Sequence, residues 1–313
     1  MNTKHFQHRA SDGANINVYC WLPDGAPRRL MHIVHGMAEH AGRYTALAES
    51  LTNAGYAVFA QDLRGHGQTG HLGKQQGHFA DTDGWQRVIA DVREIHELMR
   101  SEHPQLGVVL FGHSMGSFIA QDCVARFGSQ LDAVVLSATD MPPAALRLAG
   151  QMAAWIERKR QGPDKSSALL QTLSFGNFNR PFVRENGTAR TEFEWLSADT
   201  AEVDKYIDDP DCGFACTTET WWQLLAAIGR VQSRSSIQAM PANLPMLLIA
   251  GSEDPVARNG KGPQALATKY RRMGITDVST KIIAGGRHEL LNDQPREQVI
   301  NDMLAWLDRR LNT

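Results

Sequence analysis

The sequence predicts an α/β fold in which a mostly parallel central sheet is flanked by helices and carries a helical insertion. Three observations lead to this prediction. Short apolar runs alternate with longer segments of helical period, several of these runs are too continuously apolar for a sheet with one solvated face, and the alternation stops over one long interval. With 42% hydrophobic and 21% charged residues, the chain can also build a sizeable core.

Strands and helices follow one another in the order that parallel sheets require. Six apolar runs bounded by turn residues predict strands at 29–34, 56–61, 107–111, 133–137, 246–250 and 279–284. Segments of helical period predict helices at 44–53, 85–101, 115–127, 263–273 and 295–311. An earlier segment, 15–22, alternates apolar and polar residues before Pro23, which predicts an antiparallel strand at the edge of the sheet.

One interval, residues 141–240, breaks this alternation. It contains no convincing strand, but 144–160 and 217–230 have helical patterns and the interval holds most of the tryptophans. No Gly/Ser-rich linker marks it as a separately tethered unit. We therefore expect a core domain made of residues 1–140 and 241–313, interrupted by a mainly helical insertion at 141–240.

Charge and composition exclude several classes of protein. The formal net charge is -2, whereas a nucleic-acid binder usually carries a basic excess, so no nucleic-acid partner is expected. Four cysteines do not make a disulfide framework in a chain of 313 residues, and residues 1–13 lack the apolar stretch of a secretory signal. We therefore expect a cytoplasmic protein. No apolar run approaches the roughly 18 residues needed to span a bilayer.

Two local clusters have alternative interpretations. The run from Glu157 to Arg160 is the most basic segment, and we expect a solvated helix face, with contact to anionic lipid head groups as the alternative. Cys212 and Cys216 are the only close cysteine pair, and no neighbouring histidine or second pair completes a zinc ligand set. No metal site is expected.

The strongest chemical motif is a GxSxG pattern from Gly112 to Gly116. It directly follows a predicted strand and directly precedes a predicted helix, as a nucleophile elbow requires. The glycines remove crowding around a sharply turned backbone, so the hydroxyl of Ser114 can project from the sheet. The sequence therefore predicts Ser114 as a nucleophile.

A serine hydroxyl needs a base that is oriented by a carboxylate. His288 lies in a turn after the last predicted strand, and the carboxyl ends of parallel strands gather at one edge of a sheet, which brings His288 near Ser114. His113 is the alternative base, although packing at the elbow is its simpler role.

The orienting acid is predicted from its place in the chain. Asp254 follows a predicted strand and gives the chain order Ser, acid, His. Its rivals as the acid are Asp140 and Glu253.

An oxyanion hole needs two backbone N–H donors. One is the amide of Met115, at the start of the helix after the elbow. Gly36 permits a tight turn after the strand at 29–34 and presents the amide of Met37 as the second donor, unless this segment is an ordinary strand-to-helix loop.

These motifs together resemble the α/β hydrolase superfamily and, within it, the monoacylglycerol lipase and lysophospholipase-like branch. Residues 35–40 resemble the HGxGEH segment of that branch, Arg43 and Tyr44 continue it, residues 64–67 resemble its next loop, and the elbow GHSMG is similar as well. The resemblance covers the chain from about residue 30 to the end, and the insertion matches least. Ala38, Thr69 and Ser117 depart from the usual residues of the branch.

The resemblance implies that residues 141–240 form a cap over the active site. Several apolar cap residues could then line an acyl tunnel, although each could equally pack on the core or on other cap residues. These are Leu146, Leu148, Met152, Trp155, Ile156, Trp221, Trp222 and Leu225. The cap could also make a peripheral membrane contact.

Taken together, the sequence predicts a serine carboxylic-ester hydrolase that acts on small-molecule apolar acyl esters through an acyl-enzyme and needs no metal or organic cofactor. Two alternatives stay open. An aminopeptidase or amidase would need an acidic cluster for a substrate ammonium, which Glu192, Glu194, Asp199, Glu202 and Asp204 could supply. A hydrolase scaffold retained as a non-catalytic ligand-binding module is the second.

Overall fold

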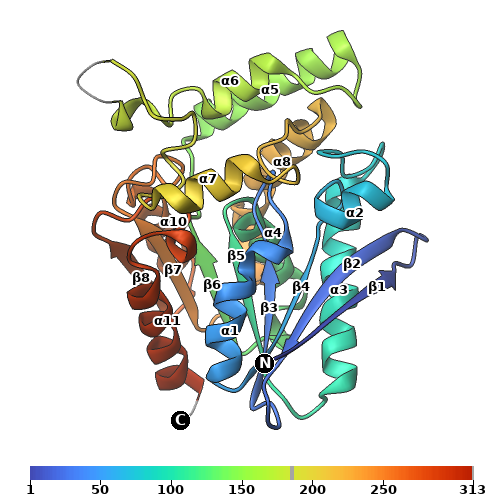
Figure 1. Cartoon of the computed structure of the whole chain (residues 1–313), viewed down its shortest axis with the longest axis vertical. Helices are drawn as coiled ribbons and strands as arrows, with labels where there is room; N and C mark the ends of the chain where they lie inside the picture. Colours follow the sequence, from blue (N-terminus) through green and yellow to red (C-terminus); the bar gives the residue numbers. More distant parts are fainter. Residues whose placement is uncertain (184–186, 312–313) are drawn as a thin grey trace.

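The computed structural model describes residues 1–183 and 187–311. Its described part contains an eight-stranded sheet with the strand order β1-β2-β4-β3-β5-β6-β7-β8 (Figure 1). The strands are β1 (Asn2–Arg9), β2 (Asn15–Leu22), β3 (Arg29–Val34), β4 (Tyr56–Gln61), β5 (Val108–His113), β6 (Ala133–Ser137), β7 (Met246–Gly251) and β8 (Val278–Ile283).

Six of these strands, β3 to β8, pair in parallel, as the order of the sequence predicts. The antiparallel strand expected at 15–22 is β2, but it does not lie at the edge of the sheet. It pairs with β4 on one side and with β1, the actual edge strand, on the other. The sequence of β1, NTKHFQHR, contains a single large apolar residue, Phe6, and therefore gives no alternating signal.

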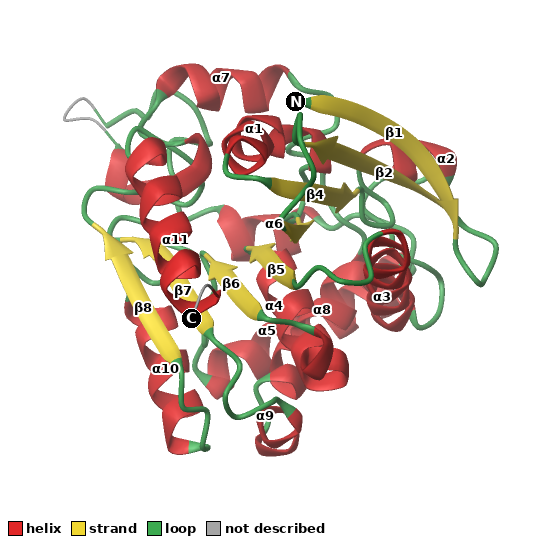
Figure 2. Cartoon of the chain, turned by 90° about the horizontal axis from the view of Figure 1, so that it is seen from below, coloured by secondary structure: helices red, strands yellow, loops and turns green. Residues whose placement is uncertain are grey.

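Helices cover both faces of the sheet (Figure 2). One face packs against α1 (Thr45–Asn53) and α11 (Arg296–Leu311) through a cluster that includes Leu47, Val109 and Trp306. The other face packs against α3 (Gly84–Glu102), α4 (Met115–Phe127) and α10 (Lys261–Arg272). Burial on both faces explains why the central strands are continuously apolar.

The chain between β6 and β7 is helical wherever a regular element is described. Its helices are α5 (Ala144–Gln161), α6 (Ala168–Phe175), α7 (Thr200–Asp208), α8 (Thr218–Val231) and α9 (Arg234–Ala239). Figure 1 shows α5 and α6 farthest from the sheet, with α7 and α8 between them and the strands. The sequence predicts α5 and α8 closely, whereas α6, α7 and α9 are too short to give a clear helical period.

The remaining helical elements are short. They are α2 (Gly67–Leu72) and the 3-10 helices Ala41–Tyr44, Gly128–Gln130, Arg180–Phe182 and Leu290–Asn292. Within the ranges that the structure describes, no helix is both long and apolar enough to cross a membrane. Because the parallel strands share one direction, the loops that follow β3, β5 and β7 reach the same edge of the sheet, beneath the helical segment.

Candidate active site

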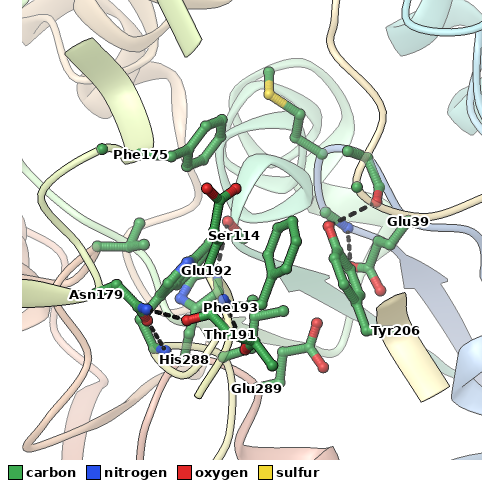
Figure 3. A pocket seen from close by; sticks show the side chains of 18 of the residues that line it. Glu39, Ser114, Phe175, Asn179, Thr191, Glu192, Phe193, Tyr206, His288 and Glu289 are labelled. Atoms are coloured by element: carbon green, nitrogen blue, oxygen red, sulfur yellow. Dashed lines mark hydrogen bonds between the residues drawn. The ribbon is translucent and has the colours of Figure 1, made fainter. Parts of the chain in front are cut away.

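Ser114 lies at the sharp turn between β5 and α4 (Figure 3). Its backbone has φ 52° and ψ -118°, a conformation that side-chain-bearing residues rarely adopt. A Cβ added to Gly112 would overlap the carbonyl oxygen of Gly116, and one added to Gly116 would overlap that of Val34. The close packing of main chain around the turn therefore requires both glycines of the motif.

Three predicted residues meet in one hydrogen-bonded chain. The Ser114 hydroxyl donates to Nε2 of His288 at 3.0 Å, with Nδ1 of His288 donating to Oδ1 of Asp254, also at 3.0 Å. The same Asp254 oxygen accepts the N–H of Val256 at 2.9 Å, which fixes the carboxylate on the turn after β7. Asp254 is fully buried and His288 is nearly so, so both groups are held away from bulk water.

The electrostatic surroundings of His288 favour a charged imidazole. Burial disfavours the charged form, but the adjacent Asp254 carboxylate outweighs this effect and the pKa of His288 is raised above its ordinary value. The neighbouring His113 ring lies 4.8 Å from that of His288, and burial lowers the pKa of His113 to about 4. His113 Nδ1 is hydrogen-bonded to Ser137, and its ring packs at the elbow.

Neither rival of Asp254 reaches the imidazole of His288. Asp140 accepts a hydrogen bond from Nε of Arg258 at 2.8 Å. Glu253 is exposed and lies 4.0 Å from Arg287. The structure thus brings together Ser114, His288 and Asp254 and directs the other two carboxylates to arginines.

The two predicted amide donors lie beside the serine. Met115 is the first residue of α4, and Gly36 and Met37 line the pocket together with Ser114. Ala38 has a positive φ of 54°, and its carbonyl accepts hydrogen bonds from the Tyr206 hydroxyl at 3.0 Å and from the Gly213 N–H at 2.9 Å. Two contacts from the helical segment therefore hold this loop in its unusual conformation.

The serine opens into a cavity of about 670 Å³, within the usual range for small-molecule sites (Figure 3). Its apolar wall comes mainly from α6 and from the segment before α7. That wall includes Met37, Phe175, Phe193, Trp195, Leu196 and Val256. The ring of Trp195 also lies 5.1 Å from that of His288 and is stacked on Phe175.

The structure corrects the expected lining of this cavity. None of the eight apolar candidates is among the described residues that line it. These candidates are Leu146, Leu148, Met152, Trp155, Ile156, Trp221, Trp222 and Leu225. Leu146, Met152 and Trp155 are 65%, 64% and 49% exposed on α5, because that helix presents one apolar face to the outside. Trp221 is buried against Phe175, and Trp222 lies under the guanidinium of Arg158.

The actual lining residues carry only a weak sequence signal. Residues 187–199 form no helix or strand, so their side chains follow no period that could reveal a pocket-facing side. The aromatic residues Phe193 and Trp195, two positions apart, are the one available clue. In the described structure they pack in a cluster with Leu196 and Tyr206.

One group of side chains has the composition of a metal site. Ligand atoms of His40, Asp209 and Cys212 all lie within 4.8 Å of one another. However, Nδ1 of His40 accepts the N–H of Gly42, so Nε2 carries the proton and donates to Asp209 at 2.9 Å. A metal ion would need a nitrogen without a proton. The cluster is explained by hydrogen bonding between the core and the helical segment.

Comparisons with known proteins agree with this geometry. The sequence profile of the serine aminopeptidase S33 family matches residues 25–295. The chain belongs to this family. It is 29% identical to the monoglyceride lipase of Mus musculus over 306 residues, which cover 96% of this chain and 89% of that protein.

Two further comparisons, one of sequence and one of structure, agree with this result. A monoacylglycerol lipase of Mycolicibacterium smegmatis is 29% identical over 94% of this chain and 93% of its own length. The solved structure of a lipase in its open form has a TM-score of 0.89 and 26% identity, with both chains covered in full. The chain is therefore an α/β hydrolase of the lipase and esterase type within the S33 family.

The raised pKa of His288 leads to a direct prediction. In wild-type protein, the imidazole of His288 should titrate above the ordinary histidine value of about 6.5. In the Asp254→Asn variant it should titrate at a lower pH, because loss of the carboxylate removes the interaction that stabilises the imidazolium. Histidine NMR titration measures both values, and His32 serves as an internal control because burial and its hydrogen bond to Gln61, rather than Asp254 or His288, set its pKa of about 4. An unchanged His288 titration in the variant would contradict this assignment.

Proposed function

We propose that this protein is a serine esterase of lipid type, with Ser114 as nucleophile, His288 as general base and Asp254 as the orienting acid. The observation that carries the proposal is the continuous chain of hydrogen bonds from Asp254 through His288 to Ser114. Its two distances of 3.0 Å lie within the range for proton transfer. Monoglyceride lipases among the relatives support ester hydrolysis as the reaction.

In the first half of the reaction, the oxygen of Ser114 attacks the ester carbonyl while Nε2 of His288 takes the hydroxyl proton. Asp254 stabilises the imidazolium, and the N–H groups of Met37 and Met115 stabilise the negative charge on the carbonyl oxygen. The tetrahedral intermediate then collapses. His288 returns the proton to the departing alcohol, and the acyl group remains on Ser114.

In the second half, water replaces the alcohol. His288 removes a proton from the water as it attacks the acyl-enzyme, and the collapse of the second intermediate returns that proton to Ser114. The carboxylic acid leaves and the enzyme is restored. Every proton and bond in this cycle is accounted for by the substrate, water and the three side chains.

The Ser114→Ala variant tests the nucleophile. Hydrolysis of a medium-chain p-nitrophenyl ester should fall by about 10³-fold or more, and labelling by a fluorophosphonate probe should disappear, because no other residue supplies the attacking oxygen. Circular dichroism should show an unchanged fold. The Ser101→Ala variant, which removes an exposed serine from α3, is the control and should label normally. Undiminished labelling of Ser114→Ala would defeat the assignment.

The positions of the acidic residues favour an ester substrate over an aminopeptidase substrate, which carries an ammonium group next to the amide bond. Of the five candidates for an ammonium site, only Glu192 lines the cavity. Arg190 is paired with Glu194 and Asp204, Glu202 is paired with Lys205 and Arg296, and Asp199 caps the start of α7. Four of the five carboxylates are thus occupied elsewhere, so this set, as far as the structure describes it, offers a substrate ammonium the single carboxylate of Glu192 rather than a cluster.

The charges around the cavity also favour a neutral ester. Three carboxylates line it, those of Glu39, Glu192 and Glu289. The buried Arg43 pairs with Glu39 and Glu289 and balances one of these charges, so a net negative charge is left. The lining cation Arg190 is already paired with Glu194 and Asp204. Among the described lining residues, no unpaired arginine or lysine is present, so a phosphate-bearing substrate would meet this negative charge there. We therefore propose a monoacylglycerol, rather than an anionic lysophospholipid, as the substrate class.

A three-way assay checks this substrate preference. A 1-monoacylglycerol should have a kcat/KM at least about 10-fold above that of a lysophosphatidylglycerol with the same acyl chain, because like charges oppose binding of the phosphate. An aminoacyl naphthylamide should not be cleaved measurably. The Glu192→Gln variant should narrow the difference between the two lipids. Faster cleavage of the naphthylamide by wild-type protein would instead favour an aminopeptidase.

We propose residues 141–240 as a cap domain on a core of residues 1–140 and 241–313, and the outer face of this cap as a membrane-contacting surface. Figure 1 shows α5 and α6 as the helices farthest from the sheet. Seven exposed apolar side chains of these two helices make up the proposed outer face. They are Leu146, Leu148, Met152, Trp155, Ile156, Leu169 and Leu173. The basic run of α5 offers little net positive charge to anionic lipid head groups, because Arg158 pairs with Glu219 and Arg160 pairs with Glu157.

Vesicle flotation tests the membrane contact. Wild-type protein should float with neutral phosphatidylcholine vesicles, and the double variant Met152→Ser with Trp155→Ser should float several-fold less, because buried apolar area drives interfacial binding. Leu72→Ser, a change at an exposed apolar residue on α2, is the matched control and should float like wild type. Equal flotation of all three proteins would contradict the assignment.

A cytoplasmic location is also a proposal. Its support is that all four cysteines are free and that Cys20, Cys123 and Cys216 are buried, as suits a chain that does not depend on disulfides.

A further inference from the structure

A buried ion cluster joins two loops of the candidate site. The guanidinium of Arg43 binds Glu289 through two parallel hydrogen bonds of 2.6 and 2.7 Å and also donates to Glu39 at 3.1 Å. The three side chains are between 5% and 9% exposed, so the cluster is shielded from water. A fork-to-fork pair of this kind fixes orientation as well as distance.

One end of the cluster holds the loop that presents the Met37 amide. Glu39 uses its second oxygen to accept the N–H of Gly36 at 2.5 Å and the hydroxyl of Tyr44 at 3.0 Å. Gly36 directly precedes Met37, so the position of the Glu39 carboxylate determines where this amide lies. Arg43 in turn fixes the position of Glu39.

The other end of the cluster holds the loop of the general base. Glu289 directly follows His288, and its backbone N–H donates to the carbonyl of Leu196 at 2.8 Å. Arg43 and Glu289 are 246 residues apart in the sequence, and their ion pair spans the two loops directly. Tyr206 of α7 covers the guanidinium, which lies 4.9 Å from the centre of its ring.

We propose that Arg43 is a positioning residue that sets the spacing between the Met37 amide and the imidazole of His288. The inference rests on the proposed function, since it assigns a role toward the base and the oxyanion donor. Catalysis requires both groups to meet the same substrate carbonyl, and a displacement of about 1 Å can cost about 100-fold in rate. Arginine is needed because lysine has no planar fork and cannot make the three bonds in fixed directions.

The Arg43→Lys variant tests this role because it keeps the charge and removes the fork. Its kcat on a medium-chain p-nitrophenyl ester should fall by about 10- to 100-fold, with KM changed by less than about 3-fold. Arg64→Lys is the matched control. The guanidinium of Arg64 also donates hydrogen bonds to two carboxylates, those of Asp12 and Asp91. Its side chain is 10% exposed, compared with 9% for Arg43, and it does not line the cavity that contains Ser114. Its kcat should stay within about 3-fold of wild type.

The pH profile separates positioning from a change of charge. The ionisable groups facing His288 are Asp254, Glu289, Glu39 and His113. Arg43→Lys leaves the formal charge of all of them unchanged, so the acidic limb of kcat/KM should keep its midpoint while kcat falls. A shifted midpoint with kcat restored at high pH would mean an electrostatic role and would overturn the inference. Equal losses in Arg43→Lys and Arg64→Lys would overturn it as well.

A double variant keeps the test decisive if lysine is poorly accommodated. Arg43→Met with Glu289→Gln removes one positive and one negative charge, so the net charge of the cluster stays at one negative charge. The ion pair that joins the two loops is lost. The kcat of the double variant should stay at least about 10-fold below wild type, and wild-type kcat in this variant would overturn the inference. Fluorophosphonate labelling of the wild-type protein tests the proposed function separately. If the wild-type protein does not react with the probe, the proposed function is overturned, and the inference about Arg43 is overturned with it.

Discussion

The backbone conformation of Ser114 is the constraint on which the site depends. A φ of 52° in a residue with a side chain costs of order 1 to 3 kcal/mol, and it persists only where the surrounding structure enforces it. Here β5 and α4 are both fixed by core packing, and the glycines at 112 and 116 let the main chain of neighbouring segments approach. The parallel sheet therefore determines the direction of the hydroxyl, and the loops after β7 and β8 bring the other two groups to it.

The helical segment does more than cover the serine, because it is hydrogen-bonded to the loop of the base. The N–H of His288 donates to the carbonyl of Trp195, and Arg287 donates through its guanidinium to the carbonyls of Glu194 and Ser197. Asp293 joins the same two segments, since its carboxylate accepts from the N–H groups of Ala198 and Arg287. A displacement of residues 193–198 would therefore also displace the imidazole of His288.

The sequence predicts local structure well, and it predicts contacts between distant residues only where the order of the strands brings those residues together. Four strands, β2, β3, β4 and β6, have the predicted bounds, because apolar period and turn residues are properties of neighbouring residues. The hydrogen-bonded group of Ser114, His288 and Asp254 could also be predicted, since parallel strands end at one edge. The lining of the cavity could not, because an amphipathic helix such as α5 has the same period whether its apolar face points inward or outward.

The histidines show that an adjacent carboxylate, rather than burial, identifies the candidate general base. Burial lowers the pKa of five histidines, and His288 is the one whose pKa is raised among those shifted in the described part of the chain. The five are His32, His35, His66, His96 and His113. His288 is buried as well, and the adjacent Asp254 carboxylate is what raises its pKa. That contact joins residues 34 positions apart and exists only once the loops after β7 and β8 have been brought together by the sheet.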